Sequence, residues 1–166
     1  MRFREKLSID HPIAAVKRAY GQREFFLKRY AELGFSNIQL RDDGGDGQRD
    51  YRIAFGATQK VDLPAFARKI LGETQQLEQE EHWNLTAGTG RIVMRPRNAP
   101  LSIQAEVRMV EAGDATRLEI DWEVKAKIPL IGGKIESLAA EEIRARMPRD
   151  AELSNRLIGE LTSRGA

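Results

Sequence analysis

The sequence of 166 residues contains no cysteine, which excludes disulfide bonds, thiolate metal ligands and a thiol nucleophile. It has only two histidines, His11 and His82, and neither is accompanied by a serine and an acid that suggest a catalytic arrangement. No stretch approaches the roughly 20 apolar residues of a membrane span, and the first six residues are mostly charged where a signal peptide needs an apolar run. We therefore expect a cytoplasmic protein without a metal ion or cofactor.

An excess of charge of one sign is also missing. The 27 basic and 25 acidic residues give a net charge of +2, and the two signs are interleaved along the chain. A nucleic-acid surface needs a block or stripe of basic residues, so the composition favours a solvated surface of mixed charge. The length fits a single globular domain covering residues 1–166, with no linker or low-complexity run.

One long helix, from about Gly133 to Thr162, is the strongest pattern in the sequence. An apolar stripe recurs with the helical period: Ile135, Leu138, Ala139, Ile143, Ala145, Leu153, Leu157 and Leu161. Pro148 lies inside this span, where a proline costs roughly 3 kcal/mol. The leucines beyond Pro148 return in phase with the isoleucines before it, and the proline falls on the opposite side. The pattern therefore predicts one kinked helix with its proline facing solvent.

Seven strands are expected in the rest of the chain. The clearest is residues 117–128, where six apolar residues alternate with charged ones. The other strands are expected near residues 2–9, 36–41, 51–55, 74–85, 91–97 and 101–111, with helices after Pro12, over Gln22–Leu33 and over 62–72. Short connections between successive strands favour antiparallel pairing. The sequence predicts an α+β fold in which one apolar face of the sheet is covered by the long helix.

Several aspartates lie where chain reversals and helix starts are expected. Asp10 and Asp62 are predicted to cap helices that Pro12 and Pro64 help to start. The glycine and aspartate cluster at residues 42–47 is predicted to be a hairpin turn. It lacks the spacing and the terminal glutamate of a calcium loop.

Two junctions carry a resemblance to a known superfamily. They are Ile9-Asp10-His11-Pro12 with Val16, and the run from Ile128 to Glu136 that leads into the long helix. With the order of elements, these residues resemble the SRPBCC superfamily, which has the START-like or helix-grip fold. The stretch Leu63–Lys69 further resembles an actinobacterial family of unknown function within it. The resemblance covers nearly the whole chain and implies a curved antiparallel sheet of about seven strands (β-α-α-β6-α) around the kinked helix, with a cavity for an apolar small molecule.

Glu142, Arg146 and Asp150 succeed one another at intervals of four residues, within the stripe of leucines on the long helix. Burying charge is costly unless it is paired. One interpretation is that these residues face the cavity, where Arg146 binds the carboxylate, phosphate or phenolate of an amphiphilic ligand. The other is a surface ladder of ion pairs at the edge of the sheet.

Glu5, Gln79 and Glu81 share the parity of apolar residues in their strands. They are either carboxylates and an amide facing the cavity or residues at poorly covered strand ends. A similar ambiguity applies to the aromatic residues, which either line a cavity or belong to an ordinary core. The short helix around Phe66 is either a lid or a fixed plug over the cavity mouth.

The leading hypothesis is a protein that binds an apolar or amphiphilic molecule, such as a lipid, quinone or polyketide, between the sheet and the long helix. An enzyme resembling polyketide cyclases or dehydratases, using Glu5, Glu81 or Arg146, and a protein-interaction module with a collapsed cavity are the alternatives. No residue is singled out as catalytic or as a metal ligand. The candidate ligand-binding residues are Phe26, Tyr30, Tyr51, Phe66, Glu81, Trp83, Trp122, Glu142 and Arg146.

Overall fold

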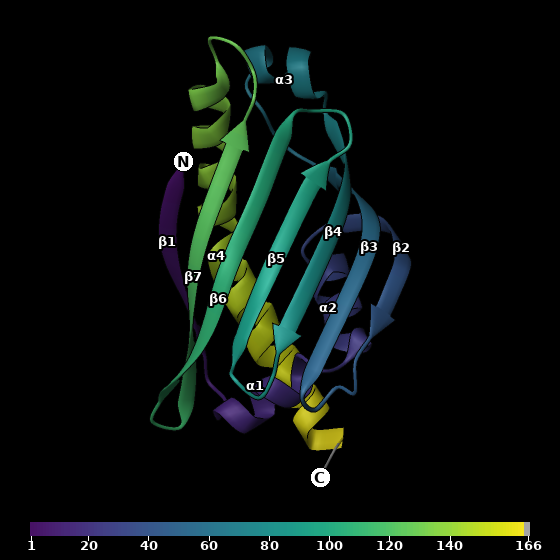
Figure 1. Ribbon diagram of the computed structural model, residues 1–166, viewed down its shortest axis with the longest axis vertical. Coiled ribbons are helices and arrows are strands. Elements are labelled where there is room, and N and C mark those ends of the chain that lie inside the picture. The colour runs from purple at the N-terminus through teal and green to yellow at the C-terminus, as the bar shows by residue number, and fades with distance from the viewer. Residues whose placement is uncertain (165–166) are drawn as a thin grey trace.

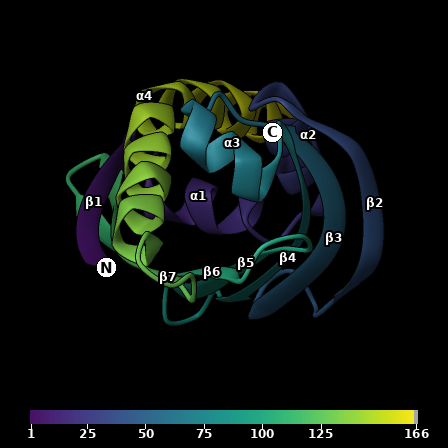
Figure 2. The same ribbon diagram turned by 90° about the horizontal axis from the view of Figure 1, so that it is seen from above.

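The computed structural model describes residues 1–164, and it shows a curved seven-stranded sheet with a long helix lying across its concave face (Figures 1 and 2). The elements in chain order are β1 (Arg2–Ile9), α1 (Ile13–Ala19), α2 (Arg23–Glu32), β2 (Phe35–Gly44), β3 (Asp50–Lys60), α3 (Ala65–Leu71), β4 (Thr74–Asn84), β5 (Thr89–Pro96), β6 (Leu101–Ala112), β7 (Ala115–Ala126) and α4 (Gly132–Arg164).

The sheet has the strand order β1-β7-β6-β5-β4-β3-β2, and all its neighbours are antiparallel. β1 pairs with β7, the last strand in the sequence, with Leu7 opposite Leu118. α1 and α2 then carry the chain across to β2 at the other edge. The alternation predicted for β7 is confirmed, because Leu118, Ile120 and Val124 are all buried. The observed α+β fold is the one that the sequence predicts.

α4 is one continuous helix through Pro148, as predicted. Pro148 is exposed, while Ile135 and Leu157 on either side of it in the sequence are buried against the sheet. Figure 2 shows the helix bending as it crosses the open side of the sheet. Ala145, which the pattern places in the apolar stripe, is exposed instead. Ala145 lies at one edge of the predicted stripe, whereas Ala140 and Ile158, beyond its other edge, are buried. The buried face of α4 is therefore rotated away from Ala145.

The predicted aspartate caps are wrong. Pro12 and Pro64 themselves occupy the N-cap positions of α1 and α3, and neither helix has a side-chain cap. Asp10 and Asp62 lie two residues earlier, which is too far from the first free N–H groups of the helix. The predicted hairpin turn is confirmed, since it connects β2 to β3 and the Asp46 carboxylate accepts hydrogen bonds from the N–H groups of the residues that follow.

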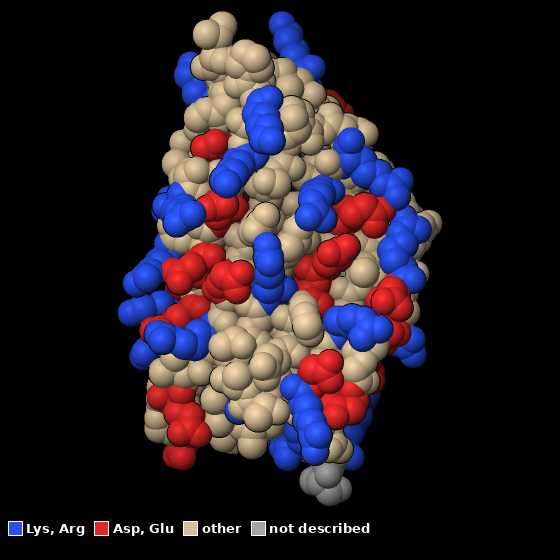
Figure 3. All heavy atoms as spheres, in the orientation of Figure 1, with Lys and Arg blue, Asp and Glu red and all other residues tan. Residues whose placement is uncertain are grey.

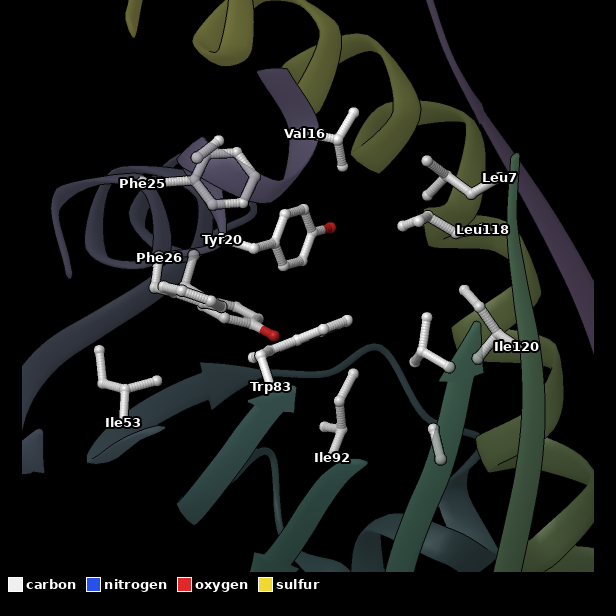
Figure 4. Close-up of a cluster of buried hydrophobic side chains, with 14 of the residues drawn as sticks. Leu7, Val16, Tyr20, Phe25, Phe26, Ile53, Trp83, Ile92, Leu118 and Ile120 are labelled. Carbon is white, nitrogen blue, oxygen red and sulfur yellow. The ribbon is translucent and has the colours of Figure 1, made fainter. Parts of the chain in front are cut away.

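The core contains a cluster of aromatic rings between the two N-terminal helices and the sheet (Figure 4). The Tyr20 ring lies 4.5 Å from that of Trp83 and 4.9 Å from that of Phe25, and Phe26 stacks on Tyr51 at 5.7 Å. A smaller apolar cluster lies at the other end of the molecule, where Leu63, Ala67 and Leu71 pack on Ile135. None of the helices within residues 1–164 is long and apolar enough to cross a membrane.

Candidate functional site

Two small cavities lie between the sheet and α4. The first has a volume of about 50 Å³, and its wall includes Tyr20, Tyr30, Trp83 and Trp122. The second, of about 70 Å³, extends toward α3, and its wall is formed largely by Val61, Leu63, Leu71, Leu101, Ile135 and Leu138. Met94, Ile143 and Arg146 border both cavities. The space under the helix is therefore divided into two chambers by these three side chains.

Arg146 is the most unusual residue of this partition. Its side chain is largely buried, yet no hydrogen bond or ion pair joins it to another residue within 1–164, and its guanidinium lies 5.5 Å from the centre of the Phe35 ring. Burial lowers the pKa of Arg146 from its ordinary value, although the charge of Glu142 opposes that shift. The surface ladder of ion pairs is not formed.

Asp150 pairs with Arg29 of α2 rather than with Arg146. Arg29 Nε and Nη2 donate to the two carboxylate oxygens of Asp150 at 2.7 and 2.9 Å, and Ser154 Oγ donates to the same carboxylate at 3.0 Å. Burial disfavours the charged form of Asp150, but the charge and hydrogen bonds of Arg29 more than offset it and hold the pKa of this carboxyl below its usual range. The pair engages one of the two carboxylates that lie four residues from Arg146 on α4, Asp150, and leaves Arg146 without a hydrogen bond to it.

Two residues in the wall of the first cavity carry donors that lack a partner. Arg29 Nη1 and Trp122 Nε1 are both fully buried, and no acceptor within residues 1–164 reaches either of them. Buried N–H groups in proteins nearly always have an acceptor, from the chain, from water or from a ligand. In the wall of the second cavity the corresponding residue is Gln75, whose unpaired atom is an acceptor, Oε1. The two chambers therefore favour different chemical groups.

A hydrogen-bonded network around Glu81 supports the side chains that line the first cavity. The Tyr30 hydroxyl donates to Glu81 Oε2, which also accepts from Gln79 Nε2 at 2.8 Å, and Trp83 Nε1 donates to Glu81 Oε1 at 3.1 Å. Burial, and next the charge of Glu81, raise the pKa of Tyr30 well above its ordinary value. Glu81 itself borders neither cavity. The network therefore fixes the rings of Tyr30 and Trp83, which do line the first cavity.

The structure brings only some of the predicted site residues together. The first cavity is lined by four of them, Tyr30, Trp83, Trp122 and Arg146. The second cavity is lined by two, Glu142 and Arg146. Phe26 and Tyr51 belong to the packed aromatic cluster, and the Tyr51 hydroxyl donates to Asp43 at 2.9 Å. Phe66 is 42% exposed on the outer side of α3. Glu5 pairs with Arg144 at 2.9 Å near the edge of the sheet.

Arg29 and Met94 were missed by the sequence reasoning. Arg29 follows Phe25 and Phe26 by four and three residues, which places it on the same face of α2, so helical periodicity could have marked it. Met94 lies in a strand whose inward face was ambiguous from the sequence alone, and pairing with β4 and β6 settles its direction.

This architecture, a curved antiparallel sheet around a long C-terminal helix, is the START-like or helix-grip fold. The protein TTHA0849 from Thermus thermophilus matches with a TM-score of 0.66 at 14% identity, over 97% of this chain and 99% of that one. The Zhui aromatase/cyclase from Streptomyces sp. R1128 matches with a TM-score of 0.60 at 14% identity, over 100% and 96%. A START superfamily protein from Mycobacterium smegmatis matches with a TM-score of 0.56 at 14% identity, over 96% and 98%.

The chain belongs to the family described as protein of unknown function (DUF2505), whose model matches residues 5–158. No curated protein matches the sequence. At 14% identity the likeness to the solved structures establishes the fold alone. The function must therefore be argued from the cavities and their walls.

Proposed function

We propose that this protein binds an amphiphilic small molecule between the sheet and α4, with an anionic or other oxygen acceptor group of the ligand at Arg146. The observation that carries the proposal is the largely buried guanidinium of Arg146, which has no acceptor within residues 1–164 and borders both cavities. A largely buried cation without a hydrogen-bonded acceptor is costly, and a bound carboxylate, phosphate or phenolate would lower that cost.

The chemistry of the two walls supports a placement for each end of the ligand. The wall of the first cavity includes Arg29 and Trp122, which carry unpaired donors, together with Arg146, so this cavity suits the acceptor group. The second cavity is larger and mostly aliphatic, so it suits the apolar tail, whose burial contributes about 25 cal/mol per Å². A fatty acid, a quinone and an acidic polyketide all combine these two features.

Binding requires the partition to move. The cavities measure about 50 and 70 Å³, whereas a cavity of about 150 Å³ is needed for a molecule the size of benzene. Two of the dividing side chains, Met94 and Arg146, are long and unbranched and can change rotamer at small cost. In the proposed complex they turn aside and the two chambers become one. Because the two volumes together are about 120 Å³, still less than a benzene site, the walls of the chambers must also move apart.

A matched pair of probes tests this proposal. Dodecanoate and dodecanol have chains of equal length and differ in the charge of the head group, and isothermal titration calorimetry measures the affinity of each. A charge-assisted hydrogen bond contributes about 1.5–3 kcal/mol, so dodecanoate should bind more than tenfold more tightly. Arg146→Met should remove this preference, whereas Arg144→Met, which changes a neighbouring arginine paired with Glu5, should keep it.

Native mass spectrometry of the protein purified from its own source complements the titration, because it detects a small molecule that remains bound. An apo mass, together with no binding of either probe, would contradict the proposal. An equal preference for dodecanoate in the wild type and in Arg146→Met would contradict the role of Arg146 alone. The expectations of a cytoplasmic location and of no nucleic-acid partner stay predictions.

A further inference from the structure

Three segments form one end of the molecule, here called the apical end. They are residues 63–72, which include α3, residues 97–101, and residues 127–134, which lead from β7 into α4; α3 and the β7–α4 connection lie at the top of Figure 1. The N–H of Lys127 donates to the carbonyl of Pro100 at 2.9 Å, and Lys134 Nζ lies 6.0 Å from the centre of the Phe66 ring. The inner side of this end packs into the small apolar cluster that borders the second cavity.

The outer side of the apical end exposes large apolar side chains. Phe66 is 42% exposed, Ile70 41% and Leu130 104%, and these are three of the five exposed large hydrophobic residues within the described chain. Ala67 and Leu71 already supply the buried contacts of α3. The outer apolar residues are therefore not needed to hold the helix in place.

Leu130 adopts a backbone conformation that leucine rarely takes. Its φ angle is 69°, in the left-handed region, where a residue with a β-carbon is disfavoured by roughly 1–2 kcal/mol relative to its usual conformations. A glycine or an asparagine would make the same turn with less strain. The leucine adds an apolar side chain that projects fully into solvent.

The charge of the apical end is of one sign. Of the 27 basic and 25 acidic residues in the chain, five basic and no acidic residues lie in these segments: Arg68, Lys69, Arg97, Lys127 and Lys134. All five are exposed, and only Arg97 forms an ion pair with a residue of 1–164, Glu78. Asp62 and Glu73 border the first segment. The remaining chain has more acidic than basic residues, and Figure 3 shows mainly tan and blue spheres at this end.

We propose that the apical end binds the surface of an anionic lipid bilayer. Apolar side chains that project singly among lysines and arginines match a membrane interface, where the apolar groups enter the boundary of head groups and acyl chains and the cations face lipid phosphates. A protein partner would instead favour a continuous apolar patch. The inference stands on the surface of α3 and the β7–α4 connection, and it does not depend on a ligand in the cavities.

Vesicle co-sedimentation of the full chain tests the proposal. The vesicles are phosphatidylcholine alone or phosphatidylcholine with about 30% phosphatidylglycerol, a fraction chosen to give a clearly negative surface potential, each at low and at high salt. The protein should sediment with the anionic vesicles only, and less so at high salt. Lys69→Gln with Lys134→Gln should weaken binding about thirtyfold, since each basic residue near such a surface contributes roughly fivefold. Lys6→Gln with Arg18→Gln, which makes the same change of charge elsewhere, should have little effect.

Leu130→Asn tests the apolar contribution without disturbing the fold, because asparagine tolerates the left-handed conformation. It should lower vesicle binding several-fold and leave the melting temperature unchanged or higher, whereas Leu40→Asn, on β2, should bind as the wild type does. Absence of binding to anionic vesicles would overturn the proposal, as would equal losses in the apical and control variants. A concentration-dependent dimer that Leu130→Asn abolishes, with vesicle binding unchanged, would also overturn it.

Discussion

Arg29 on α2 and Asp150 on α4 hold the two helices together by paired hydrogen bonds of 2.7 and 2.9 Å inside the protein. The two residues are 121 positions apart in the sequence. This pair fixes α4 one turn beyond Arg146, and it directs the hydrogen bonds of the Asp150 carboxylate to Arg29 rather than to Arg146. Asp150 therefore affects both the stability of the fold, through its pair with Arg29, and the cavity, through the absence of a bond to Arg146.

Asp150→Ala should destabilise the protein strongly, because it leaves the buried guanidinium of Arg29 without its anion. Breaking a buried pair in this way costs about 3–5 kcal/mol. Urea unfolding measures the change, and Asp121→Ala is the matched control, since Asp121 pairs with Arg4 on the exposed face of the sheet. Similar losses in the two variants would show that the internal pair has no special role.

The same pair should make stability depend on pH in a defined direction. The pKa of Asp150 is lower in the folded protein than its ordinary value of 3.8, so the unfolded chain takes up the proton more readily. The stabilisation is complete above about pH 5 and is lost as the pH falls through the lower folded pKa. The difference in unfolding free energy between the wild type and Asp150→Asn should therefore shrink between about pH 5 and about pH 2. A constant difference over this range would contradict the assignment.

Arg146→Met should stabilise the ligand-free protein. Methionine fills similar space without a largely buried charge that has no hydrogen-bonded acceptor, and we expect a gain of about 1 kcal/mol in the free energy of unfolding. Thermal and urea unfolding measure it, with Arg144→Met as the control that removes only a partly exposed pair. A clear loss of stability in Arg146→Met would show that Arg146 has a structural partner instead.

Tyr30→Phe tests the network around Glu81. The change removes a buried donor to the carboxylate, and we expect a cost of about 1.5–3 kcal/mol. Tyr51→Phe removes a donor to Asp43, which is partly exposed and can turn to water, so the cost should be smaller. Equal losses would indicate that the network contributes no more than an ordinary hydrogen bond.

The sequence predicted those helices and strands in which apolar residues recur with a regular period. The alternation of β7 and the phase of the leucines around Pro148 indicated the sheet and the continuous helix, because both depend on one face being buried along many residues. The inward parity of Gln79 and Glu81 was also visible, and both residues are buried. The periodic pattern is enough to predict burial where the burial of a residue is set by its position in its own helix or strand.

The site depends on pairings between distant elements, which no local pattern contains. The partner of Asp150 lies on α2, and the partner of Glu81 is Tyr30, 51 residues earlier. Helical spacing suggested that Asp150 would pair with Arg146 four residues away, yet the packing of α2 against α4 presents Arg29 with better geometry. The division of the cavity by Met94, Ile143 and Arg146 likewise becomes visible only when the separate segments that carry them are placed together.

The two indole N–H groups provide the most direct measurement of the central claim, that a ligand is held between the sheet and α4. Trp122 belongs to the wall of the first cavity, and its Nε1 has no partner within residues 1–164, whereas Trp83 Nε1 is already bonded to Glu81. In a ¹H–¹⁵N spectrum titrated with dodecanoate, the Trp122 indole signal should shift and saturate while the Trp83 indole signal moves much less. The account is contradicted if neither indole signal moves at millimolar dodecanoate. It is also contradicted if both signals move in proportion to the dodecanoate concentration without saturating.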